Sequence, residues 1–216
     1  LLGLPMGATF LVDVTAFTFM ALFIARLGPE ISAAHQIAAN VAVFLFMVPV
    51  ALGSATGVLV GQALGAGNGG RARHAGLLGL MVGVTAAAIL GAAVYIGARP
   101  LARAYTIDPQ VAAAAATLLA IVAFYHLADS VQAVMAQVLR GYKRAMAPMV
   151  IYALSLWGVG LGGGYLLGLT DSFGPARGAA GFWIAAVASL AIAGAGVLAY
   201  FLRISRHVAP VPIYQR

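Results

Sequence analysis

The sequence contains no cysteine and very little charge. With no cysteine among 216 residues, disulfide bonds and thiol chemistry are excluded. Lys, Arg, Asp and Glu together make up 8% of the residues, against about 25% in an average soluble domain. Hydrophobic residues make up 63% of the chain, and the mean hydropathy is +1.01. A water-soluble surface cannot be built from so few charges, so we expect most of the chain to face lipid or to pack against itself.

Acidic residues are scarcer than basic ones. The chain has 5 acidic and 12 basic residues, which gives a formal net charge of +7. Such an excess could indicate nucleic-acid binding, but basic loops are also the ordinary means by which membrane proteins fix their orientation. We therefore expect membrane lipids as partners and no nucleic acid.

The sequence also lacks the motifs of several enzyme classes. It has no His-Glu-x-x-His motif and no serine in a nucleophile motif, and the glycine-rich stretch 61–76 lacks the Gly-Lys-Ser/Thr ending of a phosphate loop. Two buried aspartates can form a proteolytic dyad, but neither Asp13 nor Asp129 follows the Gly-x-Gly pattern of two-aspartate membrane proteases. We expect no enzyme activity and no cofactor; an intramembrane hydrolase is an alternative that these absences disfavour. Because ATP has no binding loop here, an ion gradient is the expected energy source.

Six apolar segments are each long enough to cross the hydrocarbon core of a bilayer, which takes about 20 residues. Only helices fit, because backbone polar groups in lipid must bond within their own segment. The sequence therefore predicts an all-α, multi-pass membrane protein with one six-helix lobe over residues 1–203 and a cytoplasmic tail over residues 204–216. The predicted spans are about 1–25, 33–63, 75–98, 111–139, 146–169 and 179–202.

The basic residues predict an orientation. If both chain ends lie on one side, eight basic residues fall on that side and four on the other, so the positive-inside rule places both ends in the cytoplasm. The chain also starts within an apolar run and without an initiator Met, so we expect it to be a fragment or one half of a longer protein. The eight residues are Arg71, Arg73, Arg140, Lys143, Arg144, Arg203, Arg206 and Arg216.

Two acids lie inside predicted spans. A carboxylate at a helix centre costs about 2.5–3.5 kcal/mol on insertion scales, so such a residue is a functional-site candidate. Asp13 lies near the middle of the first span, with Thr9 one turn before it on the same face. A hydrogen bond that packs two helices is the alternative interpretation of Asp13.

The fourth span contains a cluster of polar residues. Tyr125, Asp129 and Gln132 share one face of the helix by their spacing, and His126 lies beside them. Hard oxygen ligands with at least one charge suit a dehydrated cation, so this face is a candidate cation site. A buried polar cluster that pins helices together is the alternative, and His126 either tunes the proton affinity of the carboxylate or packs.

The second span opens with three more polar residues, which are candidates for lining a cavity or tuning the carboxylates. Histidine in such a position is more often an interfacial or packing residue than a ligand. The three residues are His35, Gln36 and Asn40.

Three short runs together resemble the second lobe of a multidrug and toxic compound extrusion (MATE) transporter, with the NorM-like branch as the best fit. The similarity covers essentially the whole chain, in order and spacing. It implies a bacterial inner-membrane protein of twelve helices, in which two six-helix lobes enclose the substrate cavity and the first lobe is missing from this chain. The runs are Ala34-His35-Gln36-Ile37-Ala38, Gly53-Ser54-Ala55 leading to Gly61-Gln62-Ala63-Leu64-Gly65-Ala66-Gly67, and Leu139-Arg140-Gly141-Tyr142-Lys143.

The resemblance also implies a function and a site. Members of this branch export bulky, lipophilic and often cationic drugs in exchange for Na⁺ or H⁺. Their second-lobe cation site uses an acid, an aspartate and a tyrosine at positions that match Asp13, Asp129 and Tyr125, and these oxygens suit Na⁺. The first acid is commonly glutamate in the family, so Asp13 is one methylene shorter. A lipid-linked oligosaccharide flippase of related fold is the alternative; it would be expected to line its cavity with several cationic residues, which these spans lack near their centres.

Overall fold

The computed structural model describes residues 3–206, and within that range the chain is helical without a β-strand. Six helical segments are long and apolar enough to cross a membrane, which confirms the predicted all-α membrane fold. Residues 207–216 of the predicted tail lie outside the described residues. The elements are α1 (Gly3–Ala25), α2 (Pro29–Gly65), α3 (Gly69–Ile96), α4 (Ala98–Tyr105), α5 (Pro109–Gly141), α6 (Met146–Leu154), η1 (Ser155–Gly162), α7 (Gly163–Leu169) and α8 (Ala179–Ser205).

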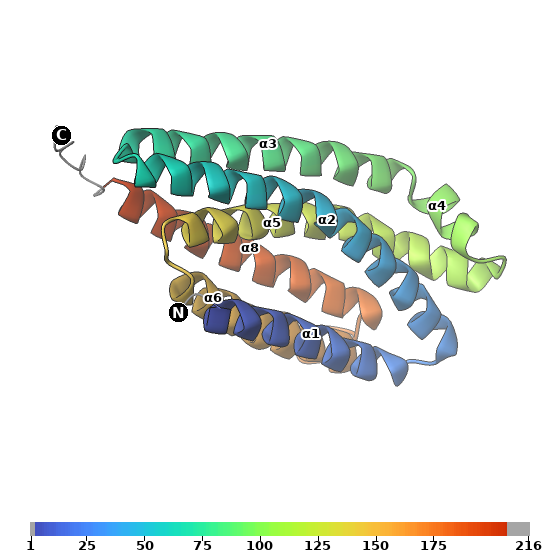
Figure 1. Ribbon diagram of the computed structural model, residues 1–216. Coiled ribbons are helices and arrows are strands. Elements are labelled where there is room, and N and C mark those ends of the chain that lie inside the picture. The colour runs from blue at the N-terminus through green and yellow to red at the C-terminus, as the bar shows by residue number, and fades with distance from the viewer. Residues whose placement is uncertain (1–2, 207–216) are drawn as a thin grey trace, which may run out of the picture.

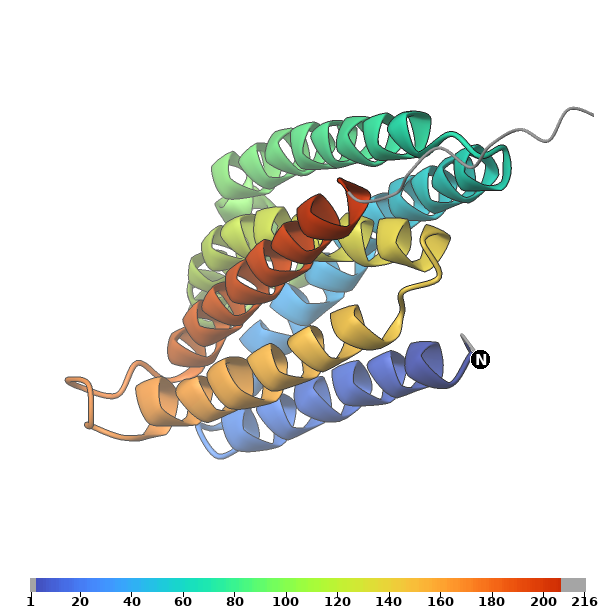
Figure 2. The same cartoon turned by 90° about the vertical axis from the view of Figure 1, so that its left-hand side faces the viewer.

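The long helices form one bundle, with the connecting turns gathered at its two ends (Figures 1 and 2). The α2–α3 and α5–α6 turns lie at the end where the described chain starts and stops, which we name the basic end for its arginine and lysine residues. The α1–α2 turn, α4 and the α7–α8 link lie at the opposite end. Helix α5 is the centre of the bundle and packs against α2, α3 and α8. Its polar residues are therefore inside the lobe rather than in lipid.

Local sequence explains where α3 and α5 begin. The Asp108 carboxylate accepts hydrogen bonds from the backbone N–H groups of Gln110 (2.8 Å) and Val111 (3.2 Å), and Pro109 occupies the first position of α5. The Asn68 side chain accepts a hydrogen bond from the backbone N–H of Arg71 at 2.8 Å and so caps α3.

Helices α2 and α5 meet backbone to backbone. A Cβ atom added to Gly57 would lie 2.8 Å from the backbone oxygen of Gln137, and one added to Gly141 would lie 2.7 Å from the oxygen of Gly57. Only a residue without a side chain permits this approach. The contact holds α5, with its aspartate, at a defined depth against α2.

Two features of the fold could not be predicted from the hydropathy of the sequence. Helix α4 is a short helix in the link after the third span, with Arg99 and Pro100 in its first turn. The fifth span is not α-helical throughout, because η1 in its middle is a π-helix. At Gly160 of η1 an added Cβ would lie 3.0 Å from the Ser189 hydroxyl of α8, so the glycine-rich sequence lets η1 pack closely on α8. Isolated π-turns are often found at functional sites.

Candidate cation site

Asp13 is held by a partner from the opposite half of the sequence. The Tyr152 hydroxyl of α6 donates a hydrogen bond to the Asp13 carboxylate of α1 at 2.5 Å. Tyr152 is buried, whereas Asp13 is partly accessible. Five residues further on, the fifth span makes a second hydrogen bond to α1, because the Trp157 indole N–H donates to the Val12 carbonyl at 3.4 Å. Helix α1 is thus attached to the α6–η1 segment at Asp13 and at the preceding residue, Val12.

An open cavity of about 250 Å³ lies in front of Asp13. Helices α1, α2, α5 and α6 all contribute to its lining, so four separate stretches of the chain converge there. Its apolar lining comes from methionine, phenylalanine, valine and alanine residues. Its polar lining consists of Thr9, Asp13, Gln132, Gln137, Arg140 and Tyr152.

Asp129 lies deeper than Asp13. Its side chain is 4% exposed, and it does not line the cavity. It is nevertheless close enough to Asp13 for the two charges to interact. The structure therefore places two carboxylates, from α1 and α5, within electrostatic range of each other; Asp13 lines the cavity, and Asp129 is buried one turn before the cavity residue Gln132.

Tyr125 completes this buried region. Its hydroxyl group lies within electrostatic range of both carboxylates. Its ring packs edge-on against Phe17 (centroids 6.3 Å apart) and Trp183 (5.4 Å). The aromatic cluster fixes the ring, so the hydroxyl is positioned by rigid neighbours. Two carboxylates and two tyrosine hydroxyls form an oxygen-rich set of the kind that hard cations prefer.

The other predicted residues separate into two groups. Thr9 and Gln132 line the cavity, and the Thr9 hydroxyl donates to the Pro5 carbonyl at 2.8 Å. His35 is buried against the Trp183 ring at 5.8 Å rather than at the surface. Gln36 and Asn40 are exposed on α2 and do not line this cavity, so the structure does not bring them to the carboxylates.

His126 is buried on α5 without a hydrogen bond. Neither ring nitrogen has a partner among the described residues, and the same holds for the Ser130 hydroxyl one turn further on. Ser130 faces α3, because a Cβ added to Gly83 would lie 3.4 Å from its oxygen. His126 is not part of the cavity lining.

Sequence reasoning missed two residues of this region. Tyr152 was one of several aromatic residues in the fifth span, and nothing in the sequence relates its register to that of Asp13, 139 residues away. Arg140 was assigned only to the basic end, but it also lines the cavity and its guanidinium donates to the Gln137 amide oxygen at 2.9 Å. The Gln137 amide nitrogen donates in turn to the Ser54 hydroxyl at 3.2 Å, which links α5 to α2.

Known proteins resemble this chain along nearly all of its length. The family model described as MatE matches residues 5–166. A "Probable multidrug resistance protein NorM" of Chromobacterium violaceum is 41% identical over 205 residues, which cover 95% of this chain and 44% of that protein. A "Multidrug resistance protein MdtK" of Photorhabdus laumondii subsp. laumondii is 39% identical, with 94% of this chain and 44% of that protein covered. The chain thus spans less than half the length of these curated relatives.

Solved structures share the fold. "Crystal structure of MATE in the bent conformation" superposes with a TM-score of 0.86 at 15% identity, over 95% of this chain and 45% of that one. "Crystal structure of eukaryotic MATE transporter AtDTX14" superposes with a TM-score of 0.83 at 18% identity, over 96% of this chain and 47% of that one. At these identities the likeness concerns the arrangement of helices alone.

Proposed function

Since this chain belongs to the MATE family, we propose that it forms the second six-helix lobe of a secondary active multidrug efflux antiporter. The antiporter would exchange bulky, lipophilic and often cationic organic compounds for Na⁺ or H⁺, and it would catalyse no chemical reaction. The names of the relatives support drug efflux. The partner required to complete the substrate cavity is the first lobe.

The observation that carries the coupling proposal is that Asp13, which lines an open cavity, lies within electrostatic range of the buried Asp129. Two carboxylates in a low-dielectric interior cannot both stay charged and unpaired, so they must share a proton, bind a cation or be hydrated. Their titration belongs to the pair rather than to either residue. The hydroxyls of Tyr125 and Tyr152 add neutral oxygens, which favours Na⁺ as the coupling ion.

Ion binding at this pair would change the contacts of α1. A cation coordinated by the Asp13 carboxylate and the Tyr152 hydroxyl oxygen would use the same groups that form the hydrogen bond between α1 and α6, so occupancy would alter that bond. It also neutralises the charge that attracts a cationic substrate. Exchange requires that the ion and the substrate differ in their affinity for the inward-open and outward-open states. The Asp13–Tyr152 bond is the described contact best placed to differ between them.

The charge distribution supports an orientation with both ends of this chain in the cytoplasm, and the bacterial relatives support the inner membrane as the location. Arg71, Lys143 and Arg144 lie at the basic end, and the acids Glu30, Asp108 and Asp171 lie at the opposite end. A basic end of this kind faces the cytoplasm by the positive-inside rule.

Dye efflux from proteoliposomes tests the proposal. The full-length protein is reconstituted, and export of a fluorescent cationic dye is measured under an inward Na⁺ gradient and separately under a pH gradient. One of the two gradients is expected to drive export. Asp13→Asn and Asp129→Asn are each expected to reduce it, while Glu30→Gln, at an exposed acid in the first turn of α2, leaves it unchanged. Export that needs neither gradient would refute the antiport mechanism.

One observation favours the alternative function of a lipid-linked oligosaccharide flippase. Arg140 lines the cavity beside Asp13, and a cationic side chain there suits an anionic pyrophosphate substrate. Translocation of a fluorescent lipid-linked oligosaccharide in the same vesicles, lost in Arg140→Gln and retained in Asp129→Asn, would support that function instead.

A further inference from the structure

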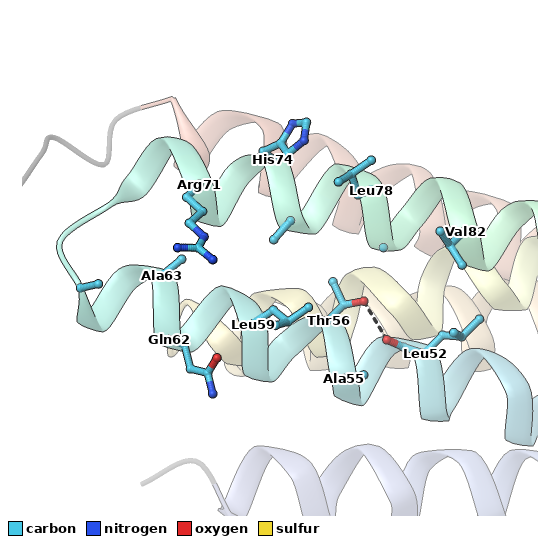
Figure 3. A pocket seen from close by; sticks show the side chains of 13 residues that line it. Leu52, Ala55, Thr56, Leu59, Gln62, Ala63, Arg71, His74, Leu78 and Val82 are labelled. Atoms are coloured by element: carbon cyan, nitrogen blue, oxygen red, sulfur yellow. Dashed lines mark hydrogen bonds between the residues drawn. The ribbon is translucent and has the colours of Figure 1, made fainter.

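A second hollow, which we name the α2–α3 groove, lies on the flank of the bundle. It is an open groove of about 630 Å³ between α2 and α3, close to the turn that joins them (Figure 3). Its walls are mostly apolar and include Leu52 and Leu59 of α2 and Leu78 and Val82 of α3. The Thr56 hydroxyl, which also faces it, donates to the Leu52 carbonyl at 2.7 Å, so this polar group is already satisfied (Figure 3). The interior of the groove is therefore suited to hydrocarbon.

The α2–α3 groove is separate from the cation cavity. Phe46 of the cavity and Ala55 of the groove are nine residues apart on α2, and so are Val50 and Leu59. Nine residues make about two and a half helical turns, which places the two members of each pair on opposite sides of the helix. A molecule in the groove would not contact Asp13.

The remaining polar groups of the groove gather at one end. Gln62 of α2 and Arg71 and His74 of α3 line the groove beside the α2–α3 turn. The Arg71 side chain extends from α3 into the space between the two helices (Figure 3). From Arg71 to Val82 the helix rises about 16 Å at about 1.5 Å per residue, which is close to half of the roughly 30 Å hydrocarbon thickness. The groove is thus about one leaflet deep, with its cationic group at the membrane surface.

No acidic side chain is available to pair with Arg71 at the basic end. Of the five acids in the sequence, Glu30, Asp108 and Asp171 lie at the opposite end of the bundle, and Asp13 and Asp129 lie inside it. An anion from outside the described residues would therefore be the counter-ion of Arg71. An anionic headgroup matches this charge, whereas a cationic drug would be repelled.

We propose that the α2–α3 groove binds one anionic phospholipid of the leaflet at the basic end. Its phosphate lies against Arg71, which extends between the two helices, and one acyl chain lies between Leu59 of α2 and the Leu78–Val82 wall of α3. A zwitterionic lipid with the same chains fits the apolar walls but gains no net attraction from Arg71. The bound lipid supplies both the hydrocarbon and the negative charge that the groove requires.

The absence of cysteine makes a site-specific test direct. In the full-length protein, Leu59→Cys in the groove and Ile192→Cys on α8 are each labelled with bimane; the native side chains are 56% and 52% exposed. The labelled proteins are placed in phosphatidylcholine vesicles that contain equal fractions of brominated phosphatidylglycerol or brominated phosphatidylcholine. Brominated phosphatidylglycerol is expected to quench the label at position 59 more strongly than brominated phosphatidylcholine does, and the two lipids are expected to quench equally at position 192.

Charge variants then test the headgroup contact. Arg71→Gln is expected to weaken phosphatidylglycerol quenching at position 59 about fivefold, the effect of one basic residue near an anionic surface. Arg71→Lys should retain most of the preference, and Arg144→Gln, which removes the same charge from the same end, should leave the preference within about twofold of the original value.

Three outcomes would overturn the proposal. Equal quenching by both lipids at position 59 means that the groove does not select an anionic headgroup. Equal losses in Arg71→Gln and Arg144→Gln mean that general surface charge, and not this groove, attracts the lipid. Quenching by neither lipid means that protein, such as the first lobe, covers the groove.

Discussion

Two hollows lie on opposite sides of α2, and of these two the smaller one is lined by a carboxylate, that of Asp13. The cavity in front of Asp13 has a volume of about 250 Å³, and the α2–α3 groove has about 630 Å³. The cavity is built by four helices that come from distant parts of the sequence, whereas the groove is built by two consecutive helices and the turn between them. The cavity contains a carboxylate with a second one within electrostatic range of it, and the groove contains only neutral and basic side chains.

The two hollows differ in how many helices build them, and not only in volume, and on this basis we propose the cavity rather than the groove as the coupling site. Placing a carboxylate inside the bundle is costly, so it has to be supported by neighbours such as Tyr152 and Tyr125 from other helices. The groove requires no such support because its apolar walls are already compatible with lipid. We therefore expect ion coupling to depend on the cavity side of α2 and lipid contact to depend on the other side.

The largest expected effect is that of removing the buried charge on the cavity side. Asp129→Asn keeps the shape of the side chain but cannot hold a cation by charge, so gradient-driven dye export should fall to the level of protein-free vesicles. Protein yield and elution from a sizing column should stay normal, because a neutral amide is easier to bury than a carboxylate. Wild-type export by this variant would remove Asp129 from the mechanism.

A smaller effect is expected from the tyrosine that bonds Asp13. Tyr152→Phe retains the ring and removes the hydroxyl donor. The cation concentration for half-maximal export is expected to change about tenfold, because a hydrogen bond to a charged group contributes about 1.5–3 kcal/mol. Tyr165→Phe is the matched control, since Tyr165 is 40% exposed and packs on Phe23. Identical half-maximal concentrations in the two variants would show that Tyr152 plays only a packing role.

Helix α2 separates the two hollows, and its close packing against α5 can be tested by substituting its glycines. Gly57→Ala places a methyl group 2.8 Å from the Gln137 carbonyl, and overpacking of this kind costs about 1–3 kcal/mol. We expect a lower thermal unfolding midpoint in detergent. Gly61→Ala lies one turn further on α2, where nothing is within 4 Å of the new atom, and should be neutral or stabilising. Equal midpoints for both variants would contradict the close α2–α5 contact.

The smallest effect is expected at the turn beside the α2–α3 groove. Asn68→Ala removes the side-chain cap of α3 and should lower stability by about 1 kcal/mol. Asn68→Asp retains an oxygen acceptor for the Arg71 backbone N–H and should behave like the original protein. The unfolding midpoints of the two variants, measured side by side, check this difference, and a loss in both would show that the amide nitrogen matters instead.

Much of the helical arrangement could be predicted from the chain because the bilayer restricts the options. Apolar runs of sufficient length have to be helices, and charged links have to lie outside the hydrocarbon. The π-helix η1 was not predictable in the same way, because its hydropathy matches that of an α-helix. Helix α4 was missed because it is short and lies outside the six spans.

The candidate site was only partly predictable. Asp13 and Asp129 stand out in the sequence because acids are rare inside spans, and Tyr125 and Gln132 follow from helical spacing on one face. Their role as cation ligands stays a prediction. Gln36 and Asn40 share the same polar character but lie on an exposed face of α2, away from the carboxylates. Which polar residues meet depends on the rotation of each helix about its axis, which hydropathy does not determine.

The sequence by itself determined that this chain crosses a membrane as helices, because its few charges exclude a soluble surface and its apolar runs match the bilayer thickness. It also determined that two carboxylates lie within those helices. Only the tertiary structure decided that Tyr152 bonds Asp13, that Asp129 lies within electrostatic range of Asp13, and that Arg71 is beside an apolar groove on the other side of α2. The reason is physical: the bilayer acts on each helix separately, whereas the pairing of side chains from different helices is decided by packing between them.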